Sequence, residues 1–206
     1  MKNIVIFLLV GICGFICACA KQGAGINKTI SESSGFAPFY VYDDFGSKNK
    51  HYVPTGWMGD VADLKMDMMC TSVKYRGNYS VKLVYAPSQK AIKQWVGVYW
   101  QNPANNWGDK KGGYNLTGAK KIVFFAKGER GNEVLSEVKV GGISGVFADT
   151  DVAWIKNIKL TNEWKEYKIN ISGSDLSSIS GGFCVVFSKK DNPGGCTVYL
   201  DEIRYE

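Results

Sequence analysis

Residues 95–107 carry the side chains of this sequence that are best suited to hold a ligand. Three of the chain's six tryptophans, Trp95, Trp100 and Trp107, fall in this stretch together with Tyr99 and several side-chain amides. Aromatic rings can pack against the C–H face of a sugar, and Asn and Gln can exchange hydrogen bonds with its hydroxyl groups. A second interpretation is that the rings fill the core of a β-domain, because aromatic residues are enriched in strands. The stretch therefore indicates either a sugar-binding surface or a structural strand.

The alternation within residues 95–101 separates these two roles, because successive side chains of a strand point to opposite faces. The more apolar face, which is expected in the core, holds Val96, Val98 and Trp100. On the other face, Trp95 and Tyr99 would flank a shallow trough above Gly97. Trp57, in the turn-rich segment 53–60, is either a loop anchor or the far wall of this cleft. The predicted ligand-binding residues are Trp95, Tyr99, Gln101, Asn102, Asn105, Trp107 and Trp57.

Catalytic groups are weakly represented. His51 is the only histidine, which leaves no partner for a Ser-His-Asp or a His-metal arrangement elsewhere. Glycoside cleavage needs two carboxylates that face each other across a cleft, and the acids that could serve lack a characteristic spacing. These acids are Asp60, Asp63, Asp67, Glu163 and Glu166. Non-catalytic sugar binding is favoured, and the alternatives are a hydrolase or lyase, and a protein-binding or structural envelope protein.

Short alternating segments, separated by Gly, Asn, Asp and Pro, supply the elements that would position these residues. Besides residues 95–101 they lie at 39–44, 79–85, 122–126, 134–140, 152–158, 165–171, 183–187 and 197–205. Strands at this spacing predict an all-β fold, either an antiparallel sandwich or a jelly roll. Only residues 174–180 suggest a helical turn, and residues 53–60 are expected to form a loop.

Four of these segments together resemble a known family. They are residues 43–45 (Asp-Asp-Phe), 77–85 (GNYSVKLVY), 160–169 (LTNEWKEYKI) and 199–205 (YLDEIRY). In order and spacing they are similar to the galactose-binding-like jelly-roll carbohydrate-binding modules. The resemblance implies a jelly-roll domain over residues 38–206 that binds a polysaccharide or glycan without catalysis.

The same resemblance implies a structural calcium ion held by acids of the first and last strands. By position, Asp44 and Asp201 are the matching residues, with Asp43 in reserve. Calcium takes oxygen ligands, which carboxylates at strand ends can supply. This sequence departs from the family pattern at Gly46, where an acidic residue often follows the Phe, and at Glu202, which replaces a commoner Asp. The alternative is that these acids are solvated or paired with Lys and Arg.

The first 37 residues are expected to lie outside the fold. Residues 1–18 have a basic start and an apolar run too short to span a membrane, which predicts a signal peptide. Residues 16–19 (Ile-Cys-Ala-Cys) resemble the bacterial lipobox, which implies that Cys19 becomes a lipidated N-terminus. Residues 19–37 would then form the lipidated cysteine and a flexible tether. The expected location is the cell envelope, lipid-anchored to the outer membrane, at the cell surface or in the periplasm; plain secretion is the alternative.

The cysteines and the net charge indicate a possible disulfide and the expected binding partners. Three of the six cysteines lie within residues 1–19, which leaves Cys70, Cys184 and Cys196 for the domain. A bridge between Cys184 and Cys196 across the intervening turn is expected, and two buried thiols are the alternative. The formal net charge of +6 is mild, and an exported domain is not expected to bind nucleic acid. The expected partners are a glycan and, through the lipid, a membrane, with the domain itself a monomer.

Overall fold

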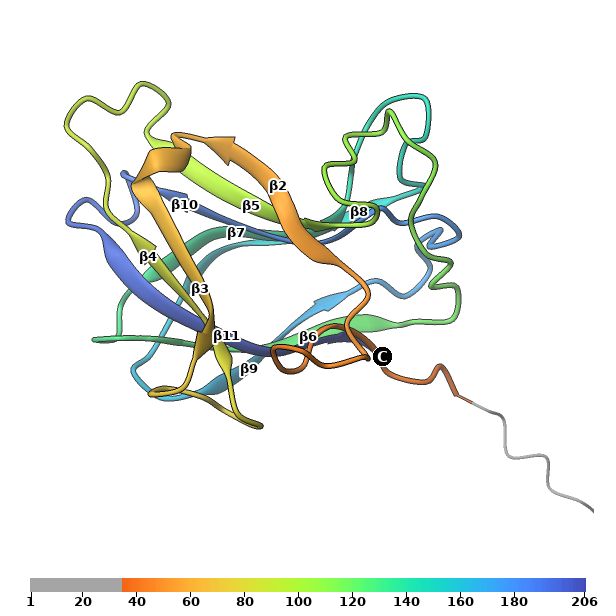
Figure 1. Ribbon diagram of the computed structural model, residues 1–206, viewed down its shortest axis with the longest axis horizontal. Coiled ribbons are helices and arrows are strands. Elements are labelled where there is room, and N and C mark those ends of the chain that lie inside the picture. Colours follow the sequence, from red (N-terminus) through yellow and green to blue (C-terminus); the bar gives the residue numbers. More distant parts are fainter. Residues whose placement is uncertain (1–34) are drawn as a thin grey trace, which may run out of the picture. The chain divides into compact units, whose positions relative to one another are not determined.

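Two antiparallel β-sheets pack face to face in the computed structural model, which describes residues 35–206 (Figure 1). One sheet has the order β3 (Leu64–Cys70), β4 (Ser80–Tyr85), β11 (Cys196–Tyr205), β6 (Lys121–Gly128) and β9 (Lys165–Asn170), and β1 (Phe39–Tyr42) also pairs with β11. The other sheet has the order β2 (Val53–Gly59), β5 (Trp95–Gln101), β10 (Gly181–Ser188), β7 (Val134–Gly141) and β8 (Val152–Lys159). We call them the six-stranded and the five-stranded sheet. The predicted antiparallel sandwich is confirmed.

The secondary structure predicted from the sequence differs from the observed one in two places. Strand β2 occupies the segment expected to be a loop, and β3 follows it after a single 3-10 turn, η1 (Val61–Asp63). Residues 174–180 contain no helix, contrary to expectation. Within residues 35–206 no helix has the length and apolar character needed to cross a membrane. The predicted signal peptide, the lipidation of Cys19 and most of the tether lie outside the described residues.

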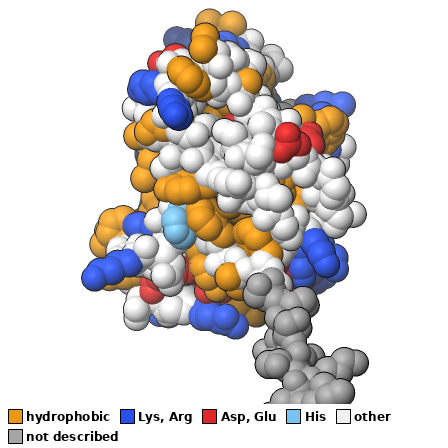
Figure 2. Space-filling view, turned by 90° about the vertical axis from the view of Figure 1, so that its right-hand side faces the viewer, with side chains coloured by type: hydrophobic (Ala, Val, Ile, Leu, Met, Phe, Trp, Pro, Cys, Tyr) orange, Lys and Arg blue, Asp and Glu red, His pale blue; other side chains and the backbone are white. Residues whose placement is uncertain are grey.

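The loops that follow β5, β7 and β9 extend from one end of the sandwich, at the right of Figure 1. Seen from that end, charged side chains lie mainly at the margins, and uncharged polar and apolar side chains occupy the middle (Figure 2). The long loops therefore present hydrogen-bonding and apolar groups rather than a charged surface at this end.

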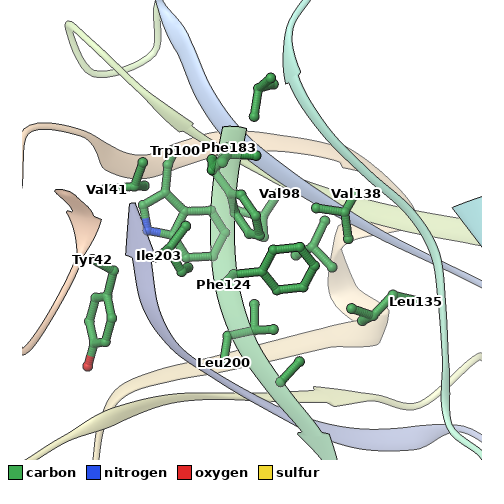
Figure 3. Close-up of a cluster of buried hydrophobic side chains, with 14 of the residues drawn as sticks. Val41, Tyr42, Val98, Trp100, Phe124, Leu135, Val138, Phe183, Leu200 and Ile203 are labelled. Atoms are coloured by element: carbon green, nitrogen blue, oxygen red, sulfur yellow. The ribbon is translucent and has the colours of Figure 1, made fainter. Parts of the chain in front are cut away.

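A cluster of aliphatic and aromatic side chains fills the space between the sheets (Figure 3). The Trp100 ring lies 5.6 Å from that of Phe183, which in turn lies 5.4 Å from that of Phe124, both in edge-to-face arrangements. Trp100, Val96 and Val98 are fully buried in this cluster. Their predicted place in the core is confirmed.

Two consecutive glycines of β10 receive tyrosine rings. A Cβ atom on Gly181 would lie 3.0 Å from the Tyr99 ring, and one on Gly182 would lie 2.5 Å from the Tyr52 ring. Tyr52 belongs to the buried core, and its hydroxyl donates to the carbonyl of Ile179. The Tyr52 ring occupies the space of a side chain at Gly182, and a side chain at Gly181 would require the Tyr99 ring to shift.

The predicted bridge between Cys184 and Cys196 is wrong, since both are free thiols. Cys184 lies in the middle of β10, opposite Tyr99 and Lys139, whereas Cys196 begins β11 in the other sheet. The turn that separates them in sequence thus connects two different sheets. Burial raises the pKa of Cys196 to about 12 and that of Cys184 further still, so both remain protonated thiols.

Candidate functional site

The outer face of the five-stranded sheet, directed away from the core, carries one continuous row of side chains. Trp154 of β8 lies opposite Lys139 of β7, Lys139 lies opposite Cys184 of β10, and Cys184 lies opposite Tyr99 of β5. Residues directly opposite one another in antiparallel strands share a face. The row therefore places an exposed tryptophan, a lysine and a buried tyrosine on one surface.

Tyr99 forms the floor of this surface rather than a platform. Its side chain is 2% exposed, and its hydroxyl donates to the carbonyl of Gly141 at 2.8 Å. The Lys139 ammonium lies 5.2 Å from the centre of its ring. Burial holds the pKa of Tyr99 far above its ordinary value. The predicted role of Tyr99 as a stacking ring is corrected, because the ring has no free face.

Trp107 rises from this floor. Its ring stands at 90° to the Tyr99 ring, with the two centroids 6.2 Å apart, and 43% of the residue is exposed. This edge-to-face arrangement is favourable between aromatic rings. A perpendicular, half-exposed indole can serve as the wall of a binding surface.

A buried amide network holds the loop that carries Trp107. Asn106 is fully buried, its Oδ1 accepts the N–H of Gly108 at 3.0 Å, and its Nδ2 donates to the carbonyl of Lys110 at 3.0 Å. Gln101 is also fully buried and donates to the carbonyl of Asn106 at 2.8 Å. The predicted ligand contact of Gln101 is corrected to a structural role. Buried polar groups need such partners.

The loop between β7 and β8 contacts the loop between β5 and β6, which carries Trp107. The N–H of Phe147 donates to the carbonyl of Gly108 at 2.9 Å, and a Cβ atom on Gly108 would lie 2.0 Å from the carbonyl oxygen of Ser144. Val146 and Phe147 at the tip of this loop are 86% and 43% exposed. The two loops rise together from one end of the five-stranded sheet, on the side away from the six-stranded sheet (Figure 1). They close that end of the surface.

Trp154 is the functional candidate that the sequence interpretation missed, since a tryptophan near the start of a strand is equally typical of a core or an edge position. It is 55% exposed, the most open of the large rings on this surface. Its position alternates with Ala153 and Ile155, which pack against the core, and matches that of Lys156. The lysine two residues onward was the signal that Trp154 faces water.

The remaining predicted residues are divided between surface and interior. Trp95 is half-buried on the outer face, but the trough expected beside it is closed, because a Cβ atom on Gly97 would lie 3.1 Å from both Met58 and Val186. Trp57 pairs with core-facing Val98 and packs against the core, so its predicted place in the cleft is corrected.

Of the two asparagines predicted to bind ligand, one makes a hydrogen bond within the protein through its side chain and the other is exposed to water. Asn102 is half-buried, and its Nδ2 donates to the Tyr114 hydroxyl at 3.0 Å. Asn105 is exposed beside Trp107, and its backbone N–H donates to Thr55 at 2.9 Å. Only the Asn105 side chain is placed to meet a ligand at this end of the surface.

Asp201, one of the residues predicted to bind calcium, is fully buried in β11. Its carboxylate accepts the N–H groups of Tyr75, Arg76 and Glu202 at 2.9, 3.1 and 2.9 Å. Burial outweighs these hydrogen bonds and raises the pKa of Asp201 to about 6. The carboxylate thereby anchors the loop between β3 and β4 to the six-stranded sheet.

Asp44 and Asp43 are also engaged near the end of β1. Asp44 accepts the N–H of Asn78 at 2.9 Å, and Asp43 accepts the hydroxyl of Ser47 at 2.8 Å. Within residues 35–206 no three His, Cys, Asp or Glu side chains are grouped so that they could hold a metal ion. Calcium takes about six to eight oxygen ligands. Calcium binding by these residues stays a prediction.

Three of the five acids considered for catalysis accept hydrogen bonds from the backbone. Asp60 accepts the N–H groups of Lys93 and Gln94 at 2.9 and 2.7 Å, and Asp63 accepts that of Ser88 at 3.0 Å. Both contacts fix the loop between β4 and β5. Asp67 similarly caps the backbone of its own strand, and Glu163 and Glu166 are exposed. These structural uses weaken the catalytic alternative.

A cavity of about 420 Å³ lies elsewhere, between the turns that connect β6 to β7 and β10 to β11. Arg130, Glu133 and Asp191 are among the residues that line it, and none of the lining residues is aromatic. It offers no ring on which a sugar could stack, so the outer face of the five-stranded sheet is the better candidate.

No protein family and no curated protein matches the sequence. Solved structures do match the fold. A family 30 carbohydrate-binding module superposes with a TM-score of 0.53 at 15% identity, over 82% of this chain and 87% of its own. The family 11 module from Clostridium thermocellum, in complex with a β-1,3-1,4-mixed-linked tetrasaccharide, gives 0.52 at 16% identity, over 79% and 92%. The predicted jelly-roll fold of carbohydrate-binding modules is confirmed.

Proposed function

We propose that this protein binds carbohydrate without catalysis, on the outer face of the five-stranded sheet. The observation that carries the proposal is the pair of exposed indoles, Trp107 and Trp154, at the two sides of one surface. The fold shared with carbohydrate-binding modules supports it. A sugar chain would lie across the strands, with one ring against each indole and hydroxyl groups toward Asn105.

The binding would be of modest strength. The surface is open, so water-bridged hydrogen bonds would contribute alongside stacking. Each indole offers apolar area at little cost in conformational freedom, but an immobilised sugar chain loses entropy on binding. Trp95, half-buried on the same face, would extend the apolar floor.

The test is polysaccharide binding by affinity electrophoresis and calorimetry with the Trp107→Ala and Trp154→Ala variants. Each substitution should weaken binding at least about tenfold, in line with loss of one aromatic anchor. Tyr75→Ala is the matched control, because Tyr75 is 39% exposed but stacks on Phe125 of the six-stranded sheet. Binding that survives both tryptophan substitutions would exclude this surface.

A hydrolase or lyase is the second candidate, kept because acids are present near both sheets. Incubation with the same polysaccharides should release no reducing ends or unsaturated products if the protein only binds. Turnover that depends on Glu163 or Glu166 would reverse the order of the two candidates.

We further propose that Cys19 is lipidated and anchors the domain in the cell envelope. The support is the signal-like start and the Ile-Cys-Ala-Cys sequence at residues 16–19. Two or more acyl chains give stable membrane attachment, whereas one is marginal. The Cys19→Ser variant should move from the membrane fraction to the soluble fraction; an unchanged membrane fraction would contradict the proposal.

A further inference from the structure

Lys139 lies at the centre of the proposed binding surface, between the two exposed indoles. Across the sheet it is the neighbour of Trp154, and two strands away in the other direction lies Tyr99, on which Trp107 stands. Strands are spaced ~4.8 Å apart, so Trp154 and Tyr99 are separated by roughly 14 Å with the lysine between them. A sugar chain that contacts both indoles must pass over this ammonium group.

The charge of Lys139 is incompletely balanced. Its Nζ lies 3.8 Å from Oε1 of Glu137, whereas Nζ of Lys156 lies 3.1 Å from Oε2 of the same carboxylate. One glutamate therefore faces two lysines and is closer to Lys156. The side chain of Lys139 is only 25% exposed, and the Tyr99 ring below its ammonium attracts but does not neutralise the charge.

Two other carboxylates near the surface accept hydrogen bonds from loop backbone. Asp109 accepts the backbone N–H of Trp107 at 3.1 Å, and Asp149 accepts that of Ile143 at 3.0 Å. Both carboxylates are thus turned toward loop backbone. Lys110 adds a further positive charge at the loop.

We propose that the surface selects acidic polysaccharides, in which a sugar carboxylate pairs with the Lys139 ammonium while a neighbouring ring stacks on Trp154. This inference rests on the proposed function. A partly buried ammonium whose one counter-ion lies at 3.8 Å and is shared with Lys156 gains more from a carboxylate than from a neutral hydroxyl, because a charge-assisted hydrogen bond is about twice as strong. Glu137 would stay with Lys156.

The experiment compares uronic acid polymers with their own neutral forms. Polygalacturonate, alginate and glucuronoxylan are each tested before and after chemical reduction of the carboxylates to alcohols, by calorimetry in about 0.15 M salt. The native form of at least one polymer should bind at least about tenfold more tightly than its reduced form. Lys139→Gln should remove that difference, so that the native and reduced forms of the polymer bind this variant equally. Lys65→Gln, on the other sheet, is the matched control.

The outcomes separate the two proposals. Equal binding of native and reduced polymers, lost in Trp154→Ala, would overturn the acidic preference and keep the proposed function. Two results together would mean nonspecific attraction between charges and would also overturn the acidic preference. They are equal binding of dextran sulfate by the parent and Lys139→Gln, and loss of the carboxylate preference at higher salt. Absence of binding to every polymer would remove the proposed function and this inference with it.

Discussion

The indole of Trp107 stands perpendicular to the buried ring of Tyr99, with the two centroids 6.2 Å apart. One aromatic side chain therefore serves as the floor and the other as the wall. The floor is fixed through the hydroxyl of Tyr99 and the carbonyl of Gly141. The position of Trp107 depends on the loop that carries it, so substitutions that disturb this loop should weaken binding.

Asn106→Ala should reduce carbohydrate affinity to the level of Trp107→Ala, although the side chain of Asn106 is fully buried. The substitution removes hydrogen bonds to Gly108, Lys110 and Ser180, and each buried partner left unpaired costs about 1–3 kcal/mol. Calorimetric titration and thermal unfolding measure the two effects. The exposed Asn162→Ala is the control; unchanged affinity in Asn106→Ala would show that the network does not position the wall.

Two tryptophans show what local pattern can and cannot predict. Pro54, Gly56 and Gly59 are typical of turns and indicate a loop around Trp57, yet β2 is an edge strand, where proline is tolerated. For Trp154, the alternation with Ala153 and Ile155 was readable, but which face the other sheet covers was not. Alternation predicted the sandwich and the core position of Trp100 correctly, because both depend on neighbours in sequence.

The loop scaffold lies beyond such reasoning. The Nδ2 of Asn106 reaches the hydroxyl of Ser180, 74 positions away, and Gly108 meets the backbone of Ser144. No periodicity in the sequence links these segments. A local pattern therefore predicts that their side-chain amides bind a ligand, whereas in the structure they bind one another's loops. Tertiary contacts between loops decide their role.

Gly108→Ala should separate the two loops at the end of the surface. Gly108 has φ +87° and a Cβ there would lie 2.0 Å from the carbonyl oxygen of Ser144, whereas Gly173 has φ +88° with open space around it. Both alanines incur backbone strain of roughly 1–2 kcal/mol, but only Gly108→Ala forces a displacement. Urea unfolding and ligand affinity should therefore fall more in Gly108→Ala than in Gly173→Ala, and equal effects would show that the loops do not need this close approach.

Trp100→Ala and Trp154→Ala should affect different properties. Trp100 is fully buried, so its truncation should lower the free energy of unfolding by about 3–5 kcal/mol. Trp154 is 55% exposed, so its truncation should change stability by less than about 0.5 kcal/mol while it reduces ligand affinity. Urea unfolding followed by tyrosine and tryptophan fluorescence measures both. A large loss of stability in Trp154→Ala would indicate that this indole is structural.

Asp201 should make the fold more stable in mild acid than at neutral pH. Its pKa is raised to about 6 in the folded protein, against an ordinary value of 3.8. The folded state therefore binds the proton more tightly, and this contribution to stability decreases as pH rises from about 4 to 6, by up to about 3 kcal/mol. The measurement is the urea midpoint of the parent and Asp201→Asn at pH 4.5 and 6.5.

The Asp201→Asn variant should lose this part of the pH dependence, because an asparagine side chain does not titrate in that range. A parent protein whose difference between the two pH values matches that of the variant would mean that the carboxyl of Asp201 titrates normally.

The paired glycines of β10 link the ligand surface to the interior at a single point. Gly181 lies under Tyr99 on the outer side, and Gly182 lies against Tyr52 on the core side. Here the sheet has only the thickness of its backbone, with a tyrosine resting on either side. A shift of this backbone toward one tyrosine ring would remove the packing of the other. Changes in ligand specificity would therefore have to arise in the loops and at Trp154 and not at these two glycines.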